Sequence, residues 1–139
     1  MLFRSAVDAG FSRMILGTGI DIIEVARIRA SCEKFGERFL KRILRPDEIG
    51  YCYSHRDPAP FLAARFAAKE AISKAFGTGI GAQLSWQDME VGRNPAGQPF
   101  VILHDGGQTL FERRGGMGWH LSLSHTQHYA AAVVILEGK

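Results

Sequence analysis

A glutamate and a lysine are spaced so that they could lie beside a metal ion and a phosphate. Glu70 and Lys74 lie four residues apart in an alanine-rich segment, which predicts that they share one face of a helix. Asp21 follows an apolar run that contains two glycines. Arg65 and Lys69 add positive charge to the same helical segment. A carboxylate such as Glu70 beside basic side chains suits Mg²⁺ and phosphate together, because Mg²⁺ takes only one or two protein carboxylates and leaves the remaining positions to water and phosphate oxygens.

Each of these features also has an ordinary structural explanation. A Glu–Lys pair at this spacing is usually a surface ion pair worth roughly 0.3–0.5 kcal/mol. An aspartate at the end of a strand usually caps a helix or forms a turn. The metal site is therefore a hypothesis, and Asp21 taken alone is more simply explained as a cap or turn residue.

A second polar cluster lies near the C-terminus. Strand alternation places His120, Ser122 and Ser124 on one face, where they could bind a phosphate or form a solvated edge. With His125 and His128, the histidines could instead hold zinc. No glutamate motif of a zinc hydrolase accompanies them, so we do not expect zinc.

Common signatures of nucleotide and hydrolase sites are absent from the sequence. It contains no phosphate loop of the Gly-x-x-x-x-Gly-Lys-Ser/Thr type, and neither Ser122 nor Ser124 lies in a Gly-x-Ser-x-Gly elbow. The glycines of Gly77–Gly81 follow a predicted helix rather than a strand, which argues against a dinucleotide fingerprint.

Composition limits the class of protein. The 139 residues suit one domain, and no apolar run approaches the roughly 18 residues that span a bilayer. The net charge of +3 suits an anionic ligand or an acidic partner but is weak evidence for nucleic acid. Cys32 and Cys52 show neither zinc nor disulfide spacing. We therefore expect a cytoplasmic protein with no membrane and no nucleic-acid partner, and we interpret residues 1–13 as a flexible extension of a domain over residues 14–139.

The periodicity of apolar residues predicts an α+β domain with the order β-α-α-α-β-β-α-β-β. The first predicted helix, Glu24 to about Phe39, carries a basic face, and Gly36 makes a break in it plausible. The remaining elements are expected at about Met14–Ile23 (strand), from Pro46 (helix), Phe61–Phe76 (helix), Trp86–Val91 (strand), Pro99–Leu103 (strand), Gly106–Arg114 (helix), Trp119–Ser124 (strand) and Ala130–Leu136 (strand).

Three segments together resemble one family. They are Gly17-Thr-Gly-Ile-Asp-Ile-Ile-Glu24, Arg65-Phe-Ala-Ala-Lys-Glu-Ala-Ile-Ser-Lys-Ala-Phe-Gly77 and His120-Leu-Ser-Leu-Ser-His-Thr-Gln-His-Tyr-Ala-Ala-Ala132. Their order and spacing are similar to those of the holo-acyl-carrier-protein synthase group of phosphopantetheinyl transferases, and the resemblance covers Met14 to the end. It implies the transferase fold, with helices packed on a mostly antiparallel sheet.

The resemblance also assigns roles to residues. It implies that Asp21 and Glu70 hold magnesium, that Lys74 contacts a phosphate of coenzyme A, and that all three take part in catalysis. Arg65 and His120 are expected at the coenzyme A pocket. Other residues expected there are Ser122 and Ser124 on the strand and Asn94, Gly97 and Pro99 near the adenine end.

The implied reaction moves 4′-phosphopantetheine from coenzyme A to a serine of apo-acyl carrier protein in fatty acid biosynthesis. It yields holo-acyl carrier protein and adenosine 3′,5′-bisphosphate and depends on magnesium. The acceptor of the serine proton is left open between Glu70, a water and a histidine. The family further implies a homotrimer with shared sites and a carrier-docking surface that includes Arg27 and Lys34.

Two other functions compete with this interpretation. A non-catalytic module could bind nucleic acid or nucleotides through the basic helix, which predicts steeply salt-dependent binding. A histidine–metal hydrolase would hold zinc tightly. Neither alternative accounts for the three segments jointly.

Overall fold

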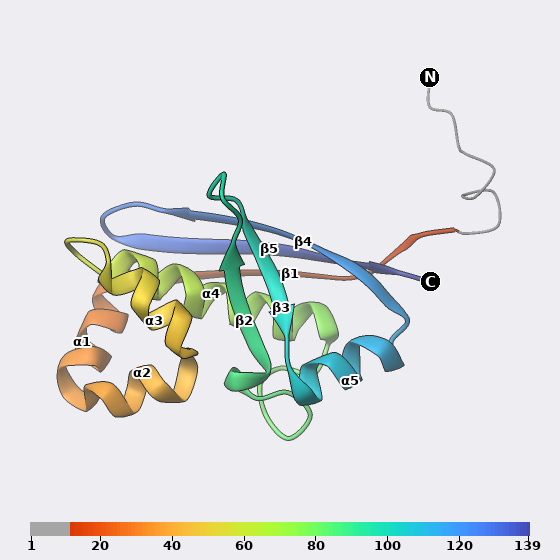
Figure 1. Ribbon diagram of the computed structural model, residues 1–139, viewed down its shortest axis with the longest axis horizontal. Coiled ribbons are helices and arrows are strands. Elements are labelled where there is room, and N and C mark those ends of the chain that lie inside the picture. The colour runs from red at the N-terminus through yellow and green to blue at the C-terminus, as the bar shows by residue number, and fades with distance from the viewer. Residues whose placement is uncertain (1–11) are drawn as a thin grey trace.

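The computed structural model describes residues 12–139, and most of the expected extension over residues 1–13 lies outside them. The chain forms an α+β domain, as predicted (Figure 1). Its elements are β1 (Met14–Glu24), α1 (Val25–Phe35), α2 (Glu37–Ile43), α3 (Pro46–Tyr53), α4 (Ala59–Phe76), the 3₁₀ helix η2 (Trp86–Asp88), β2 (Met89–Arg93), β3 (Pro99–Leu103), α5 (Asp105–Arg113), β4 (Gly116–His125) and β5 (Tyr129–Gly138).

Two antiparallel sheets form the β part of the domain. The larger has the strand order β1-β5-β4, and β2 and β3 form a separate hairpin. Helix α4 packs against one face of the larger sheet, while α1–α3 gather at one end of the molecule and α5 at the other (Figure 1). The opposite face of this sheet exposes large apolar side chains: Ile20, Ile22, Tyr129 and Val133.

Strand β1 and helix α4 approach each other unusually closely, which the two glycines of β1 permit. A Cβ atom at Gly17 would lie 1.9 Å from the carbonyl oxygen of Ala75, and one at Gly19 would lie 1.8 Å from that of Ala71. The alanines of α4 contribute small side chains to the same contact. This confirms the close approach that glycines in a strand predicted, and it brings Asp21, two residues after Gly19, to the side of α4.

The structure adds one helix to the predicted order. Gly36 adopts a φ of 58°, a backbone conformation that ends α1 and lets α2 leave in a new direction. Phe35 is consequently exposed at the end of α1.

A second difference concerns residues 86–88, which form a 3₁₀ turn instead of the start of a strand. There the Asp88 carboxylate accepts the backbone N–H of Ser85 at 2.9 Å, which stabilises the turn locally. Over residues 12–139, none of the helices is both long enough and apolar enough to span a bilayer.

Candidate active site

The structure brings Asp21, Glu70 and Lys74 together where β1 crosses α4. The ammonium group of Lys74 donates to Oδ1 of Asp21 at 3.1 Å and to the carbonyl oxygen of Ile20 at 2.9 Å. Partial burial raises the pKa of Glu70, the negative charge of Asp21 raises it further, and Lys74 opposes both effects. Two carboxylates thus repel each other beside one lysine, which is the electrostatic setting that a bound cation would relieve.

The donor set of this cluster fits Mg²⁺. Asp21 and Glu70 offer oxygen ligands from two carboxylates, and Mg²⁺ commonly takes one or two, with water and substrate phosphates filling the remaining positions. Among residues 12–139 no three His, Cys, Asp or Glu side chains are grouped so that they could enclose a metal by themselves. His120 instead bonds to Glu137, and His125 packs edge-on against Phe61.

Glu70 also lines an open pocket of about 520 Å³ between α4 and the segment that follows it. The other lining residues that matter here are Arg42 and Ser85, which offer a positive charge and a hydroxyl, and Gln87, whose amide N–H groups donate to backbone carbonyl oxygens at the end of α2. These three residues were not predicted from the sequence. They come from elements that are distant along the chain, and none belongs to a recognisable motif.

Lys69 does not join this site, so the expectation that it adds positive charge there is wrong. Its side chain is fully buried, and Nζ donates to Oε1 of Glu48 at 2.7 Å. The two remaining N–H groups donate to backbone carbonyl oxygens, that of Ile43 at 2.7 Å and that of Trp86 at 3.3 Å. All three donors of the ammonium group are therefore used inside the core.

Arg65 lies one helical turn before Lys69 and is also buried, with only 1% of its surface exposed. Its guanidinium group packs over the ring of Tyr51 at 4.3 Å, and its Nε lacks a hydrogen-bond partner among the described residues. Arg65 lines pockets beside Arg93, a second arginine within reach of the same ring. Its contact with coenzyme A remains a prediction.

The polar face of β4 has the predicted alternation. His120, Ser122 and Ser124 are exposed, while Leu121 and Leu123 face inward. Nε2 of His120 lies 2.9 Å from Oε1 of Glu137, and this hydrogen bond lowers the pKa of Glu137.

The hairpin between β2 and β3 lies next to this polar face. Asn94 and Pro99 line a pocket of about 230 Å³ together with His120. Gly97 forms the turn of the same hairpin with a φ of 88°. Asn94 and Pro99, predicted near the adenine end, thus share a pocket with His120, whereas Glu70 lines a different pocket.

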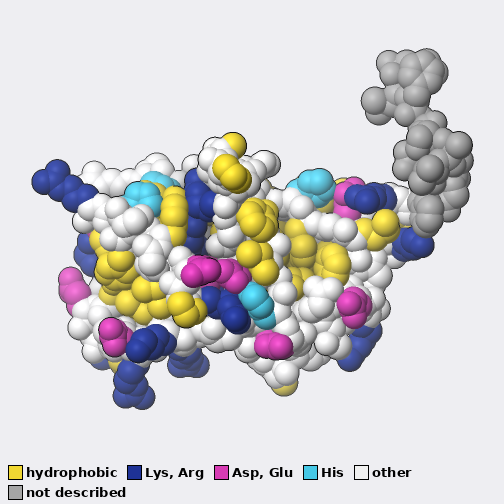
Figure 2. Space-filling model, in the orientation of Figure 1, with side chains coloured by type: hydrophobic (Ala, Val, Ile, Leu, Met, Phe, Trp, Pro, Cys, Tyr) yellow, Lys and Arg dark blue, Asp and Glu magenta, His cyan; other side chains and the backbone are white. Residues whose placement is uncertain are grey.

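Arg27 and Lys34, predicted to dock a carrier protein, are exposed on α1. The sequence did not show that the break at Gly36 opens a groove of about 480 Å³ between α1 and α2. It is lined by Ser31, Phe35, Arg38, Phe39 and Arg42. Hydrophobic side chains with Lys and Arg beside them gather over this end of the molecule in Figure 2. A surface that is both apolar and basic suits an acidic protein partner.

Comparison with known proteins places this chain in a family. Residues 17–134 match the sequence model of the 4′-phosphopantetheinyl transferase superfamily. The holo-[acyl-carrier-protein] synthase of Koribacter versatilis is 53% identical over 124 residues, which covers 89% of this chain and 99% of the relative. That of Leptospira biflexa is 40% identical over 121 residues, which covers 87% of this chain and 95% of the relative.

Solved structures show the same likeness. Holo-[acyl-carrier-protein] synthase from Neisseria meningitidis superposes with a TM-score of 0.83 at 36% identity, covering 88% of this chain and 98% of that one. The enzyme from Helicobacter pylori in complex with coenzyme A superposes with a TM-score of 0.78 at 35% identity, covering 86% and 98%.

Proposed function

This chain belongs to the holo-[acyl-carrier-protein] synthase family of the 4′-phosphopantetheinyl transferase superfamily, and we propose that it moves 4′-phosphopantetheine from coenzyme A to a serine of an apo-acyl carrier protein. The observation that carries the proposal is the meeting of Asp21, Glu70 and Lys74 beside an open pocket, in a chain that matches its relatives over nearly their whole length. The products are holo-acyl carrier protein and adenosine 3′,5′-bisphosphate.

The reaction exchanges a phosphoanhydride bond for a phosphoester bond. The serine oxygen forms a bond to the phosphorus on the pantetheine side of the diphosphate, the bond to the adenosine 3′,5′-bisphosphate oxygen breaks, and the serine proton passes to a basic group. Such a transfer needs positioning and charge stabilisation more than covalent help from the protein. Lys74 is half exposed, so its ammonium group is available to the diphosphate.

Asp21 and Glu70 are the residues that would hold Mg²⁺. When bound there, the ion would neutralise charge that develops on the diphosphate. The protein's part is to keep both carboxylates ionised and adjacent. The raised pKa of Glu70 means that its ionisation works against partial burial and the negative charge of Asp21.

We further propose that a complete site forms between neighbouring copies in a homotrimer. In a single chain, Glu70 and His120 line separate pockets, although Glu70 is expected to hold the metal of the same site in which His120 contacts coenzyme A. The exposed apolar face of β1 and β5, with Ile20 and Ile22 each about two-thirds exposed, offers a surface for a second copy. Light scattering should give about three times the 15.3 kDa chain mass. A mass of one chain would contradict the trimer.

The carrier protein is proposed to dock on α1 and α2. Arg27 and Lys34 would meet its acidic surface, and Phe35 and Phe39 would meet an apolar side chain in the groove between the helices. The cytoplasm and fatty acid biosynthesis are the proposed setting.

The function is tested by following the fate of coenzyme A. With apo-acyl carrier protein and Mg²⁺ present, one adenosine 3′,5′-bisphosphate should form for each carrier modified, as measured by chromatography. A carrier whose acceptor serine is replaced by alanine is the matched control and should give no product. Equal release of the bisphosphate with both carriers would indicate hydrolysis of coenzyme A and would overturn the assignment.

A further inference from the structure

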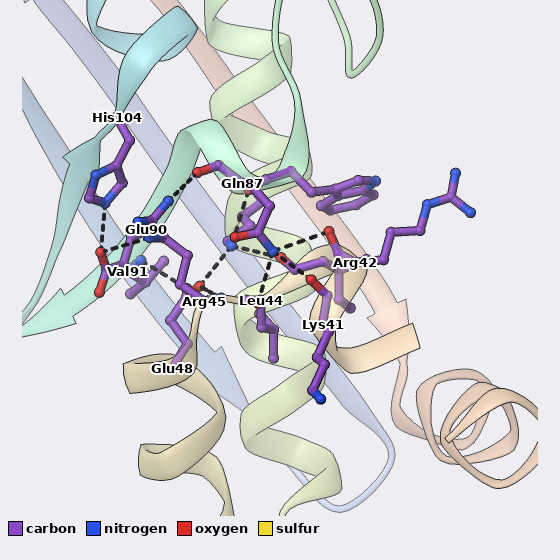
Figure 3. Close-up of polar contacts among 12 residues, drawn as sticks. Lys41, Arg42, Leu44, Arg45, Glu48, Gln87, Glu90, Val91 and His104 are labelled. Carbon is purple, nitrogen blue, oxygen red and sulfur yellow. Dashed lines mark hydrogen bonds and ion pairs between the residues drawn. The ribbon is translucent and has the colours of Figure 1, made fainter. Parts of the chain in front are cut away.

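The end of helix α2 is held by two side chains that come from other parts of the chain. Nε2 of Gln87 donates to the carbonyl oxygens of Lys41 at 2.7 Å, Leu44 at 2.9 Å and Arg42 at 3.4 Å (Figure 3). Lys69 donates to the remaining carbonyl oxygen of this run, that of Ile43, at 2.7 Å. The last carbonyls of a helix lack partners within the helix, so these contacts fix the direction in which α2 ends.

Lys69 ties this helix end to the active-site helix, because it directly precedes Glu70 in α4. The Lys69–Glu48 ion pair is fully buried. Oε1 of Glu48 also accepts the backbone N–H of Arg45 at 2.9 Å, and Oε2 accepts that of Val91 at 2.9 Å. Every charged atom of the pair is thus satisfied, and a buried network of this kind is rigid.

Gln87 contributes from η2, next to the same network. Its backbone oxygen accepts Nη1 of Arg45 at 2.8 Å, and Arg45 also pairs with Glu90 at 3.6 Å (Figure 3). His104 completes the chain of contacts, with Nε2 at 2.7 Å from Glu90. Helices α2, α3 and α4, the 3₁₀ turn and β2 are therefore joined through one set of polar bonds.

The joined elements connect two surfaces. Arg42 lines both the groove between α1 and α2 and the pocket that contains Glu70. Its backbone oxygen is one of those that Gln87 holds. The distance and angle between the groove and Glu70 thus depend on how the end of α2 is fixed to α4 and η2.

We propose that Lys69 and Gln87 are positioning residues that set the placement of a carrier protein docked on α1 and α2 relative to Glu70. The inference rests on the proposed function, because it takes the groove to be the carrier site. Removing the hydrogen bonds of Lys69 or Gln87 to the end of α2 should leave the docking groove and the coenzyme A pocket individually intact. The acceptor serine would then be bound but misplaced, so that turnover falls while binding of both substrates is retained.

Gln87→Met tests this, because it removes the amide and leaves no buried charge without a partner. We expect kcat to fall by about tenfold or more, with the KM values for carrier and coenzyme A each changed by less than about threefold. Gln108→Met, on an exposed position of α5, is the matched control and should keep wild-type kinetics. A thermal unfolding scan of each variant would show that the folded fraction is unchanged at the assay temperature.

The outcomes are separable. A Gln87→Met variant with wild-type kcat, or one whose loss lies only in the KM for carrier, would overturn the positioning role while leaving the transferase assignment in place. A wild-type protein that binds the carrier and coenzyme A but transfers nothing would overturn the proposed function and this role with it. If Gln87→Met does not fold, Gln87→Asn decides, because it keeps the amide but is one methylene shorter. It should lower kcat in the same way, and wild-type kcat in that variant would count against the proposal.

Discussion

Replacing Gly19 with alanine should separate the two halves of the predicted metal site. The added Cβ would lie 1.8 Å from the carbonyl oxygen of Ala71, whereas ordinary van der Waals contact begins at 3.4 Å. The added Cβ is attached directly to the backbone of β1, and the oxygen belongs to the backbone of α4, so no flexible side chain can turn aside. Strand β1 must therefore withdraw from α4 by more than about 1 Å, and Asp21 must move with it.

Two effects of different size should follow. Overpacking of this kind typically costs about 1–3 kcal/mol, which lowers the unfolding midpoint by roughly 3–12 °C for a domain of this size. A displacement of about 1 Å between catalytic groups can reduce the rate by about 10²-fold. Transfer activity, assayed well below both unfolding midpoints, should therefore fall far more than the folded population does.

Gly50→Ala is the matched control for this experiment. Gly50 is an exposed position in α3 where an added Cβ would meet nothing within 4 Å. The change should be neutral or stabilising by up to about 1 kcal/mol, with unchanged activity. If Gly19→Ala also retained wild-type activity and stability, the claim that these glycines bring Asp21 to Glu70 would be refuted.

Three further predictions concern single side chains. Glu70→Gln should abolish transfer without unfolding the protein. The pKa of Glu70 is raised above its ordinary 4.5, so the stability that this group contributes falls as the pH rises past that value. The Glu70→Gln variant should therefore be no less stable than wild type at neutral pH without Mg²⁺. Near-wild-type transfer activity in this variant would refute the site. Arg27→Glu should raise the KM for carrier protein with little change in that for coenzyme A, whereas an equal change in both would argue against docking on α1. Lys69→Met should lower the free energy of unfolding by about 3–5 kcal/mol in urea titrations, because Glu48 loses its buried partner; a loss below about 1 kcal/mol would mean that the pair is not buried as described.

Local patterns in the sequence predicted much of the fold. The alanine-rich run predicted α4, although the helix begins two residues earlier than expected, at Ala59. Alternation in β4 placed His120, Ser122 and Ser124 on one face correctly. The glycines of β1 predicted a close approach that the structure confirms at Gly17 and Gly19. Each of these features depends on residues that are close together in the chain.

Features that depend on distant residues were not predictable in the same way. Lys69 is a charged residue beside Glu70, but only the fold shows that Glu48, in another helix, holds it inside the core. Gln87 lay in a predicted strand, so its amide could not be matched to the end of α2. The separation of the Glu70 and His120 pockets likewise follows from the packing of elements, which the order of motifs along the chain does not determine.

The most direct test of the central claim is the intact mass of an apo-acyl carrier protein after incubation with this protein and coenzyme A, with Mg²⁺ and with EDTA. A gain of about 340 Da, the mass of one phosphopantetheine group, is expected with Mg²⁺ and not with EDTA. No gain with several carrier proteins, from a sample shown to be folded, would contradict the assignment of this chain as a phosphopantetheinyl transferase.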